Sequence, residues 1–175
     1  MKTIVYIVLI LLSINLYSQN KSFTLADTNV EIGDSCYVYP LFILDGGYPL
    51  SSESIKISDS IRDFLNNNPT VAIEIQSHTD CRPIPMTNDT LSLRRSKILK
   101  ITVLEDSNID ADRIIAVGCG DRNPRIVTKN IHEKYPFLPV GQVLTEEFIR
   151  EVKDRQQKEF AHSLNRRTLI KVVKK

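Results

Sequence analysis

The chain has 175 residues, 42% hydrophobic and 25% charged, and this is enough to bury the core of one globular domain without metals or disulfides. Its formal net charge is +2, and the charged residues are spread along the chain. This distribution excludes the concentrated basic field that recruits nucleic acid.

The N-terminal segment has the layout of a secretory signal peptide. One lysine, Lys2, precedes an apolar run from Ile4 to Leu16 and a short polar exit. The run is shorter than the roughly 20 residues of a membrane-spanning helix. We therefore expect residues 1–19 to direct export and to be removed, with an uncleaved membrane anchor as the alternative. Residues 20–35 are expected to form a polar linker.

The first predicted elements of the domain are a strand and a helix. The segment CYVYPLFIL, residues 36–44, is β-branched and aromatic, and the turn-rich sequence DGGYP follows it. A helix can begin at Ser51 or Ser52, because a serine hydroxyl caps free N–H groups, and the sequence NNNP ends it. Its apolar residues share one face that can pack on a sheet, namely Ile57, Ile61, Phe64 and Leu65.

A second strand, a second helix and a third strand follow. The segment VAIEIQS, residues 71–77, alternates with a period of two, which predicts a half-buried strand. The next helix is expected from near Thr90 to about Glu105. The segment RIIAVG, residues 113–118, predicts the third strand.

The C-terminal part begins with an irregular region. Residues 118–141 contain three prolines and three glycines, so we expect an ordered loop without regular elements. Apolar residues at helical spacing predict one helix from Thr145 to about Leu164, and TLIKVVKK, residues 168–175, predicts a closing strand. The order β-α-β-α-β-loop-α-β predicts an α/β (α+β) sandwich, with the helices packed on a four-stranded mixed sheet.

Five short motifs connect these elements to a known family. They are HTD at 78–80, LSLRRS at 91–96 after Asn88, NIDADRI at 108–114, GCGDRNP at 118–124 and NRRT at 165–168. Together they resemble the OmpA-like C-terminal domain, over residues 36–175. The resemblance implies a peptidoglycan-binding module of the periplasm or the outer membrane that is not an enzyme and has no cofactor. Outer-membrane or other envelope proteins are its further expected partners.

The resemblance also implies which residues hold the ligand. In the family an aspartate and an arginine bind the diaminopimelate residue of the peptidoglycan stem peptide, and they fall on Asp80 and Arg95. The family's asparagine and leucine fall on Asn88 and Leu91, with Thr79 supplying further contacts. The chemistry fits, because a free amino-acid end carries an ammonium for a carboxylate and a carboxylate for a guanidinium fork, which lysine cannot reproduce.

Further residues are expected around this site. Asp80 follows a strand end and the next helix points its N-terminus at the same place, which favours a bound carboxylate. Arg166 or Arg167 is expected in a second shell, pairing with a carboxylate near the site or satisfying loop carbonyls. Arg94 is the rival of Arg95 for the ligand, and Asp45 is a candidate for lining the same pocket.

Three cysteines would reach an oxidising compartment after export, and the odd number leaves at least one unpaired in the monomer. Where the family usually has a tyrosine, this chain has Cys119. If the second and third strands run parallel, Cys81 and Cys119 leave the same edge of the sheet, whereas Cys36 starts its strand at the opposite edge. We expect a disulfide between Cys81 and Cys119, which would clamp a binding loop stiffened by Pro83 and Pro85.

A metal site and a catalytic cysteine fit the sequence less well than peptidoglycan binding does. His78 and Cys81 are metal-ligand types, but neighbouring residues at a strand end point to opposite faces and no second ligand pair follows at the right spacing, so no metal is expected. A catalytic Cys81 lacks an orienting third group. The main alternative is a protein–protein interaction module of the envelope that uses residues 125–164, called the excursion below.

Overall fold

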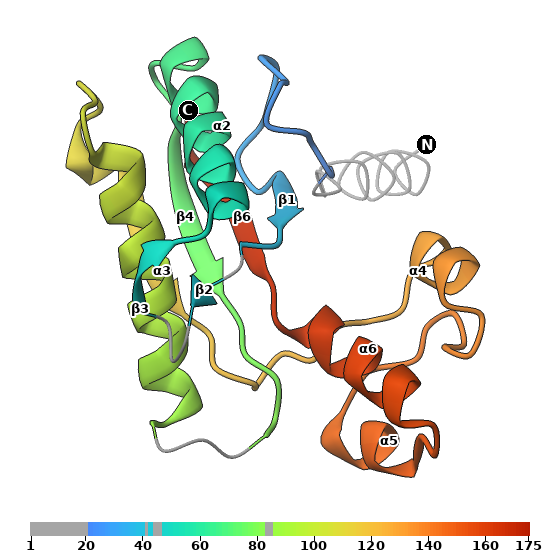
Figure 1. Cartoon of the computed structure of the whole chain (residues 1–175). Coiled ribbons are helices and arrows are strands. Elements are labelled where there is room, and N and C mark those ends of the chain that lie inside the picture. The colour runs from blue at the N-terminus through green and yellow to red at the C-terminus, as the bar shows by residue number, and fades with distance from the viewer. Residues whose placement is uncertain (1–20, 41, 44–46, 83–85) are drawn as a thin grey trace, which may run out of the picture.

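The structure is a computed structural model that describes residues 21–40, 42–43, 47–82 and 86–175 (Figure 1). The expected signal peptide, Asp45 and the two loop prolines lie outside these residues. Four strands form one mixed sheet in the order β1-β6-β4-β5, in which only β4 and β5 run parallel. This confirms the predicted four-stranded mixed sheet. The strands are β1 (Ser35–Val38), β4 (Ala72–Ser77), β5 (Ile114–Gly118), preceded by the short helix η1 (Ala111–Arg113), and β6 (Thr168–Lys174).

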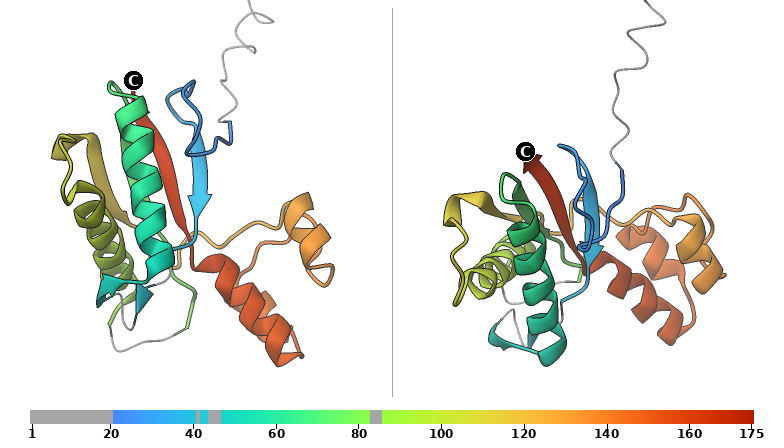
Figure 2. Two further views of the ribbon diagram at one scale, coloured as in Figure 1. Left: turned by 45° about the horizontal axis from the view of Figure 1, so that its top comes forward. Right: turned by 90° about the horizontal axis from the view of Figure 1, so that it is seen from above.

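Two long helices lie side by side on one face of this sheet (Figure 2). The first, α2 (Ser52–Asn67), begins after the predicted cap Ser51. The second, α3 (Asn88–Leu104), begins two residues earlier than expected, because the Thr87 hydroxyl accepts a hydrogen bond from the Thr90 N–H and caps it. No helix in the described part of the chain is long and apolar enough to cross a membrane.

The first predicted strand is shorter than expected. β1 ends at Val38 instead of continuing to residue 44. Pro40 has no N–H to donate to a strand ladder, which explains a break at this point. The chain then forms β2 (Phe42–Ile43), which pairs antiparallel with β3 (Gly47–Leu50) in a separate two-stranded sheet. The sequence DGGYP, residues 45–49, therefore overlaps the second strand of a hairpin.

The segment expected to be a linker is packed on the domain. Val30 is almost fully buried, and the Phe23 ring stacks on the ring of Phe64 in α2 at 5.1 Å between centroids. The Gly33 N–H donates to the Val172 carbonyl at 2.9 Å. Residues 21–34 are thus part of the folded domain, and its main core extends to them.

The excursion folds into a lobe beside the end of the sheet where β4 ends and β6 begins (Figures 1 and 2). It holds α4 (Lys129–Lys134), α5 (Glu146–Glu151) and α6 (Arg155–Asn165). The expected single helix from 145 to 164 is two helices, because Asp154 caps a new one by accepting from the Gln157 N–H. The lobe has a small core of its own, made by Val127, Leu138, Leu144, Ile149, Ala161 and Leu164.

Candidate functional site

Backbone hydrogen bonds hold the end of β4 between its two neighbouring segments. The His78 N–H donates to the Arg167 carbonyl at 2.8 Å, and the Thr79 N–H donates to the Gly120 carbonyl at 2.9 Å. These bonds extend the sheet past the last regular residues of β4. As a result Asp80 is fixed where β5 ends and β6 begins, and only 6% of it is exposed.

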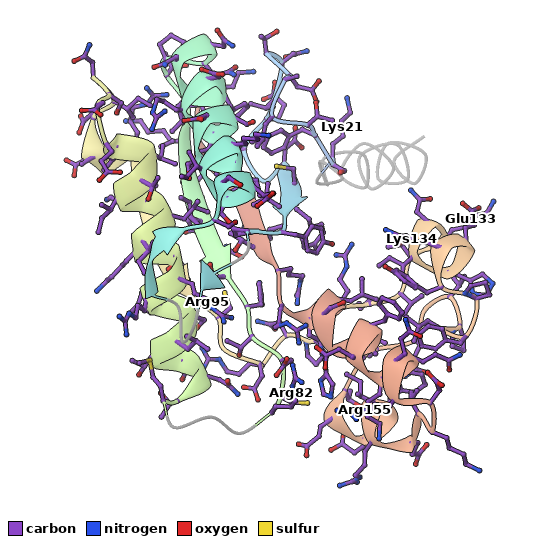
Figure 3. The ribbon with its side chains drawn as sticks, in the orientation of Figure 1. Lys21, Arg82, Arg95, Glu133, Lys134 and Arg155 are labelled. Carbon is purple, nitrogen blue, oxygen red and sulfur yellow. The ribbon has the colours of Figure 1, made fainter. Side chains whose placement is uncertain are left out.

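Two arginines hold the Asp80 carboxylate. Its Oδ2 accepts from Arg82 Nη2 and from Arg166 Nη1, each at 2.6 Å, and its Oδ1 accepts from the backbone N–H of Arg82 at 3.1 Å. Glu159 of α6 binds the same two guanidinium groups, at 2.9 and 2.8 Å. Figure 3 shows Arg82 between α3 and α6. Four charges from two distant parts of the chain, the segment after β4 and the region of α6, thus form one network.

The network sets the charge of Asp80. Burial alone would raise the pKa of this carboxyl, but the hydrogen bonds from Arg82 and Arg166 outweigh it and hold the pKa below its usual value. The carboxylate is therefore ionised at neutral pH. Arg167 instead donates to the carbonyls of Asn165 and Asn123. Arg166 thus pairs with a carboxylate and Arg167 with loop carbonyls, and their second-shell role around a ligand stays a prediction.

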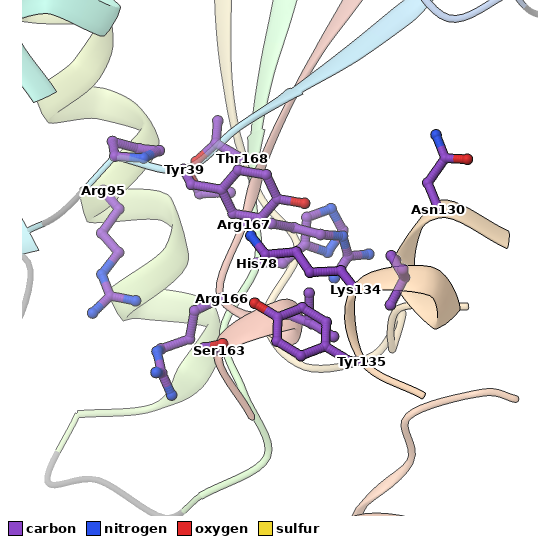
Figure 4. A pocket seen from close by; sticks show the side chains of 14 residues that line it. Tyr39, His78, Arg95, Asn130, Lys134, Tyr135, Ser163, Arg166, Arg167 and Thr168 are labelled. Atoms are coloured by element: carbon purple, nitrogen blue, oxygen red, sulfur yellow. Dashed lines mark hydrogen bonds between the residues drawn. The ribbon is translucent and has the colours of Figure 1, made fainter. Parts of the chain in front are cut away.

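A cavity of about 510 Å³ opens beside this network (Figure 4). Its walls come from the ends of β1 and β4, from α3, from the entry to β6, and from α4 and α6 of the excursion. No acidic side chain lines it in the part of the chain that the structure describes, so the lining carries net positive charge. Its four cationic lining residues are Arg95, Lys134, Arg166 and Arg167.

Arg95 is placed in the cavity and Arg94 is not. Arg95 lines the wall formed by α3, and Figure 4 shows its guanidinium on the same side as that of Arg166. Arg94 is exposed on the same helix and is not part of the lining. The geometry thus separates the two arginines, and ligand binding by Arg95 stays a prediction.

The other predicted ligand residues are not among the residues that line the cavity. Asp80 is connected to it through Arg166, which contacts both. Thr79 and Leu91 are buried, and Asn88 is the first residue of α3 and half-buried. The structure thus places Arg95 and Arg166, the partner of Asp80, on one cavity, whereas Thr79, Leu91 and Asn88 are not among its lining residues.

The helix N-terminus is not where the sequence led us to expect it. α3 starts at Asn88, so Arg95 is its eighth residue, about 10 Å along the axis. The field of a helix end falls off within the first turn. A carboxylate at Arg95 would therefore depend on guanidinium groups and gain little from the helix dipole.

His78 also lines the cavity, where the sequence did not place it. It is 6% exposed, and its Nδ1 has no hydrogen-bond partner among the described residues. Burial, followed by the positive charges of Arg167 and Arg125, lowers its pKa to about 4. The imidazole is therefore neutral at pH 7. Its position, two residues before Asp80 at a strand end, was the available signal.

The three cysteines are free thiols, so the expected disulfide is absent from the structure. Cys119 directly follows β5, and its N–H donates to the Ser77 carbonyl. Cys81 lies further along its own segment, where the charge of Glu146 acts on it. Burial raises the pKa of both thiols. The parallel strands do bring the two chain segments to one edge, but at different distances from the strand ends.

Comparison with known proteins places this arrangement among related folds. The model of the OmpA family matches residues 44–135, just over half of the chain. The periplasmic domain of Helicobacter pylori MotB has 13% identity and a TM-score of 0.51, over 77% of this chain and 70% of that one. At this identity the likeness concerns the fold alone.

Two further structures are similar at lower scores. The OmpA-like domain of FopA1 from Francisella tularensis subsp. tularensis has 13% identity and a TM-score of 0.46, over 91% of this chain and 95% of that one. The cell wall anchor of the T6SS from Pseudomonas aeruginosa has 19% identity and a TM-score of 0.44, over 77% and 76%.

Proposed function

The chain belongs to the OmpA family, and from this premise we propose that it binds peptidoglycan non-covalently, through the diaminopimelate residue of the stem peptide. In this proposal it is an exported tether or recognition module of the periplasm, associated with the outer membrane through a partner. The observation that carries the proposal is the cationic cavity at Arg95, next to an ionised aspartate.

The cavity offers both charges that a free amino-acid end requires. The ligand carboxylate would accept two hydrogen bonds from the Arg95 guanidinium, and Figure 4 shows Arg166 on the same side of the cavity. Charge-assisted bonds of this kind are roughly twice as strong as neutral ones. Two neighbouring guanidinium groups repel each other, and an anion between them relieves that repulsion.

The ligand ammonium would bind Asp80 by exchange with an existing partner. Arg82 occupies the carboxylate, but its side chain is 44% exposed, whereas that of Arg166 is 32% exposed and also contacts the cavity. Release of Arg82 to solvent is therefore the easier step. One cation replaces another at Asp80, so the buried carboxylate keeps its charge compensation throughout.

Cosedimentation with isolated cell-wall sacculi tests this function. The wild-type protein should pellet with sacculi, Arg95→Ala should stay in the supernatant, and Asp80→Asn should lose most binding. Arg94→Ala is the matched control, because it removes the same charge from an exposed position one residue away. Thermal melting checks that each variant is folded. Equal retention of Arg95→Ala and the wild-type protein would contradict the proposal.

A second candidate function is protein–protein interaction through the excursion. It is favoured by three exposed apolar side chains there, Ile126, Val140 and Val143, which are 56%, 58% and 37% exposed. Ile126 and Val143 lie opposite each other in an isolated β-bridge. If this candidate holds, substitutions at these positions reduce capture of an envelope partner, whereas the Arg95→Ala change leaves it intact.

A further inference from the structure

The cavity extends from Arg95 to a second wall that the excursion supplies. Asn130, Lys134 and Tyr135 line this wall, at α4 and the residue that follows it. Figure 4 shows the Lys134 and Tyr135 side chains reaching into the cavity from the side opposite Arg95. The excursion, which the sequence connected only with protein–protein interaction, therefore lines the same cavity as Arg95.

Packing inside the excursion holds this wall in place. The Tyr135 ring packs against Phe160 of α6 at 5.3 Å and against Phe137 at 6.4 Å between centroids. The His132 Nδ1 lies 2.8 Å from the Leu138 carbonyl, which ties the chain after α4 back to the helix. Ring packing and burial of this kind fix the wall before any ligand arrives. The Tyr135 ring and the chain after α4 are thus held in place, while the Asn130 and Lys134 side chains are exposed beside them.

The chemistry of this wall suits an anion. The Lys134 ammonium lies 5.5 Å from the centre of the Tyr135 ring, and no carboxylate pairs with it in the described part of the chain. Asn130 contributes an exposed amide with two N–H donors. In the wall between the two ends, His78 Nδ1 and Arg167 Nε are buried and have no partner among the described residues. Buried polar atoms without partners are uncommon in native proteins and ask for an explanation.

The size of the cavity allows more than one charged group of a ligand to enter. At about 510 Å³ it falls within the range of roughly 300–1,000 Å³ seen for pockets that bury ligands of drug size. Cationic groups stand at both ends, with Arg95 and Arg166 near α3 and Lys134 near α4. A ligand with one carboxylate would use only one end.

We propose that Asn130, Lys134 and Tyr135 form a second subsite, which binds the main-chain carboxylate of a stem peptide whose diaminopimelate side-chain end is held at Arg95. This subsite rests on the proposed function and gives the excursion a part in ligand selection. Lys134 supplies the charge, the Asn130 amide donates to the same carboxylate, and the Tyr135 ring covers the apolar part of the peptide. A stem peptide with a free carboxyl terminus is the preferred ligand.

Calorimetric titration with two synthetic peptides tests the subsite. One is a stem tripeptide that ends in diaminopimelate, and the other is the same peptide with its main-chain carboxyl terminus amidated. The wild-type protein should bind the free acid about five- to tenfold more tightly, as expected for one partly exposed charge-assisted contact. Lys134→Ala should bind both peptides equally, and Lys134→Arg should restore the preference.

The controls separate the subsite from the main site. Lys129→Ala removes an exposed lysine from the same helix and should keep the wild-type preference. Arg95→Ala should lower the affinity for both peptides. The subsite proposal is wrong, and the proposed function stands, if both peptides bind but the wild-type protein does not prefer the free acid. The same holds if Lys134→Ala keeps that preference. If the wild-type protein binds neither peptide, both proposals are wrong.

Discussion

The buried His78 should make the domain less stable as the pH falls from 7 to 5. Its pKa is about 4 in the folded protein, against about 6.5 for a histidine in an unfolded chain. Between these values the unfolded state binds more protons, so stability is complete above pH 6.5 and is lost as the pH falls toward 4. From pH 7 to pH 5 the free energy of unfolding should drop by about 2 kcal/mol from this group alone.

Urea denaturation at pH 7 and pH 5 measures this effect in the wild-type protein and in His78→Gln. The variant should lose about 2 kcal/mol less than the wild-type protein between the two pH values, because its side chain does not titrate. Part of the loss should remain, since burial also lowers the pKa of His162. The pKa of Asp80 is lowered, so this group adds to the loss of stability only below about pH 3.9. Equal losses in both proteins would refute the reasoning.

Three substitutions give further tests. Gly118→Ala places a Cβ about 2.6 Å from the backbone nitrogen of Leu93. The free energy of unfolding measured in urea should therefore fall by about 2 kcal/mol. An unchanged urea midpoint would contradict the close approach of α3 to Gly118. Arg82→Ala removes one partner of the Asp80 carboxylate, so stem-peptide binding measured by calorimetry should become about two- to fivefold tighter. Weaker binding would contradict the proposal that the ligand ammonium replaces Arg82 at Asp80. Arg95→Lys keeps the charge but loses the fork, so it should weaken calorimetric binding at least about tenfold, and wild-type affinity would argue against bidentate contact.

The sequence predicted the sheet and its main strands because their signals are local. Alternation over residues 71–77 and the apolar run at 113–118 predicted β4 and β5. Their parallel pairing was only a condition in the sequence analysis, and the structure shows it. The break after Val38 was also available in principle, since Pro40 cannot donate to a ladder. We nevertheless predicted one strand over residues 36–44, because this segment is apolar and aromatic.

The structure of the site could be predicted only in part. The position of Asp80 at a strand end follows from local pattern. Its partner Arg166 lies 86 residues away, so the family motif and not the spacing suggested a carboxylate partner, and it left open which of Arg166 and Arg167 has that role. From the sequence we also did not predict the second wall of the cavity, which Asn130, Lys134 and Tyr135 line. α4 has six residues and is stabilised by the core of the excursion, so its own sequence carries little helical signal.

The most direct measurement is chemical-shift mapping of the isotope-labelled protein during titration with free diaminopimelate. Peptidoglycan binding at the cationic cavity predicts saturable shifts that cluster on His78, Arg95 and Arg166, and the same titration of Arg95→Ala should leave them unmoved. An absence of shifts in the wild-type protein, or shifts confined to the exposed residues Ile126 and Val143, would contradict a diaminopimelate site at this cavity.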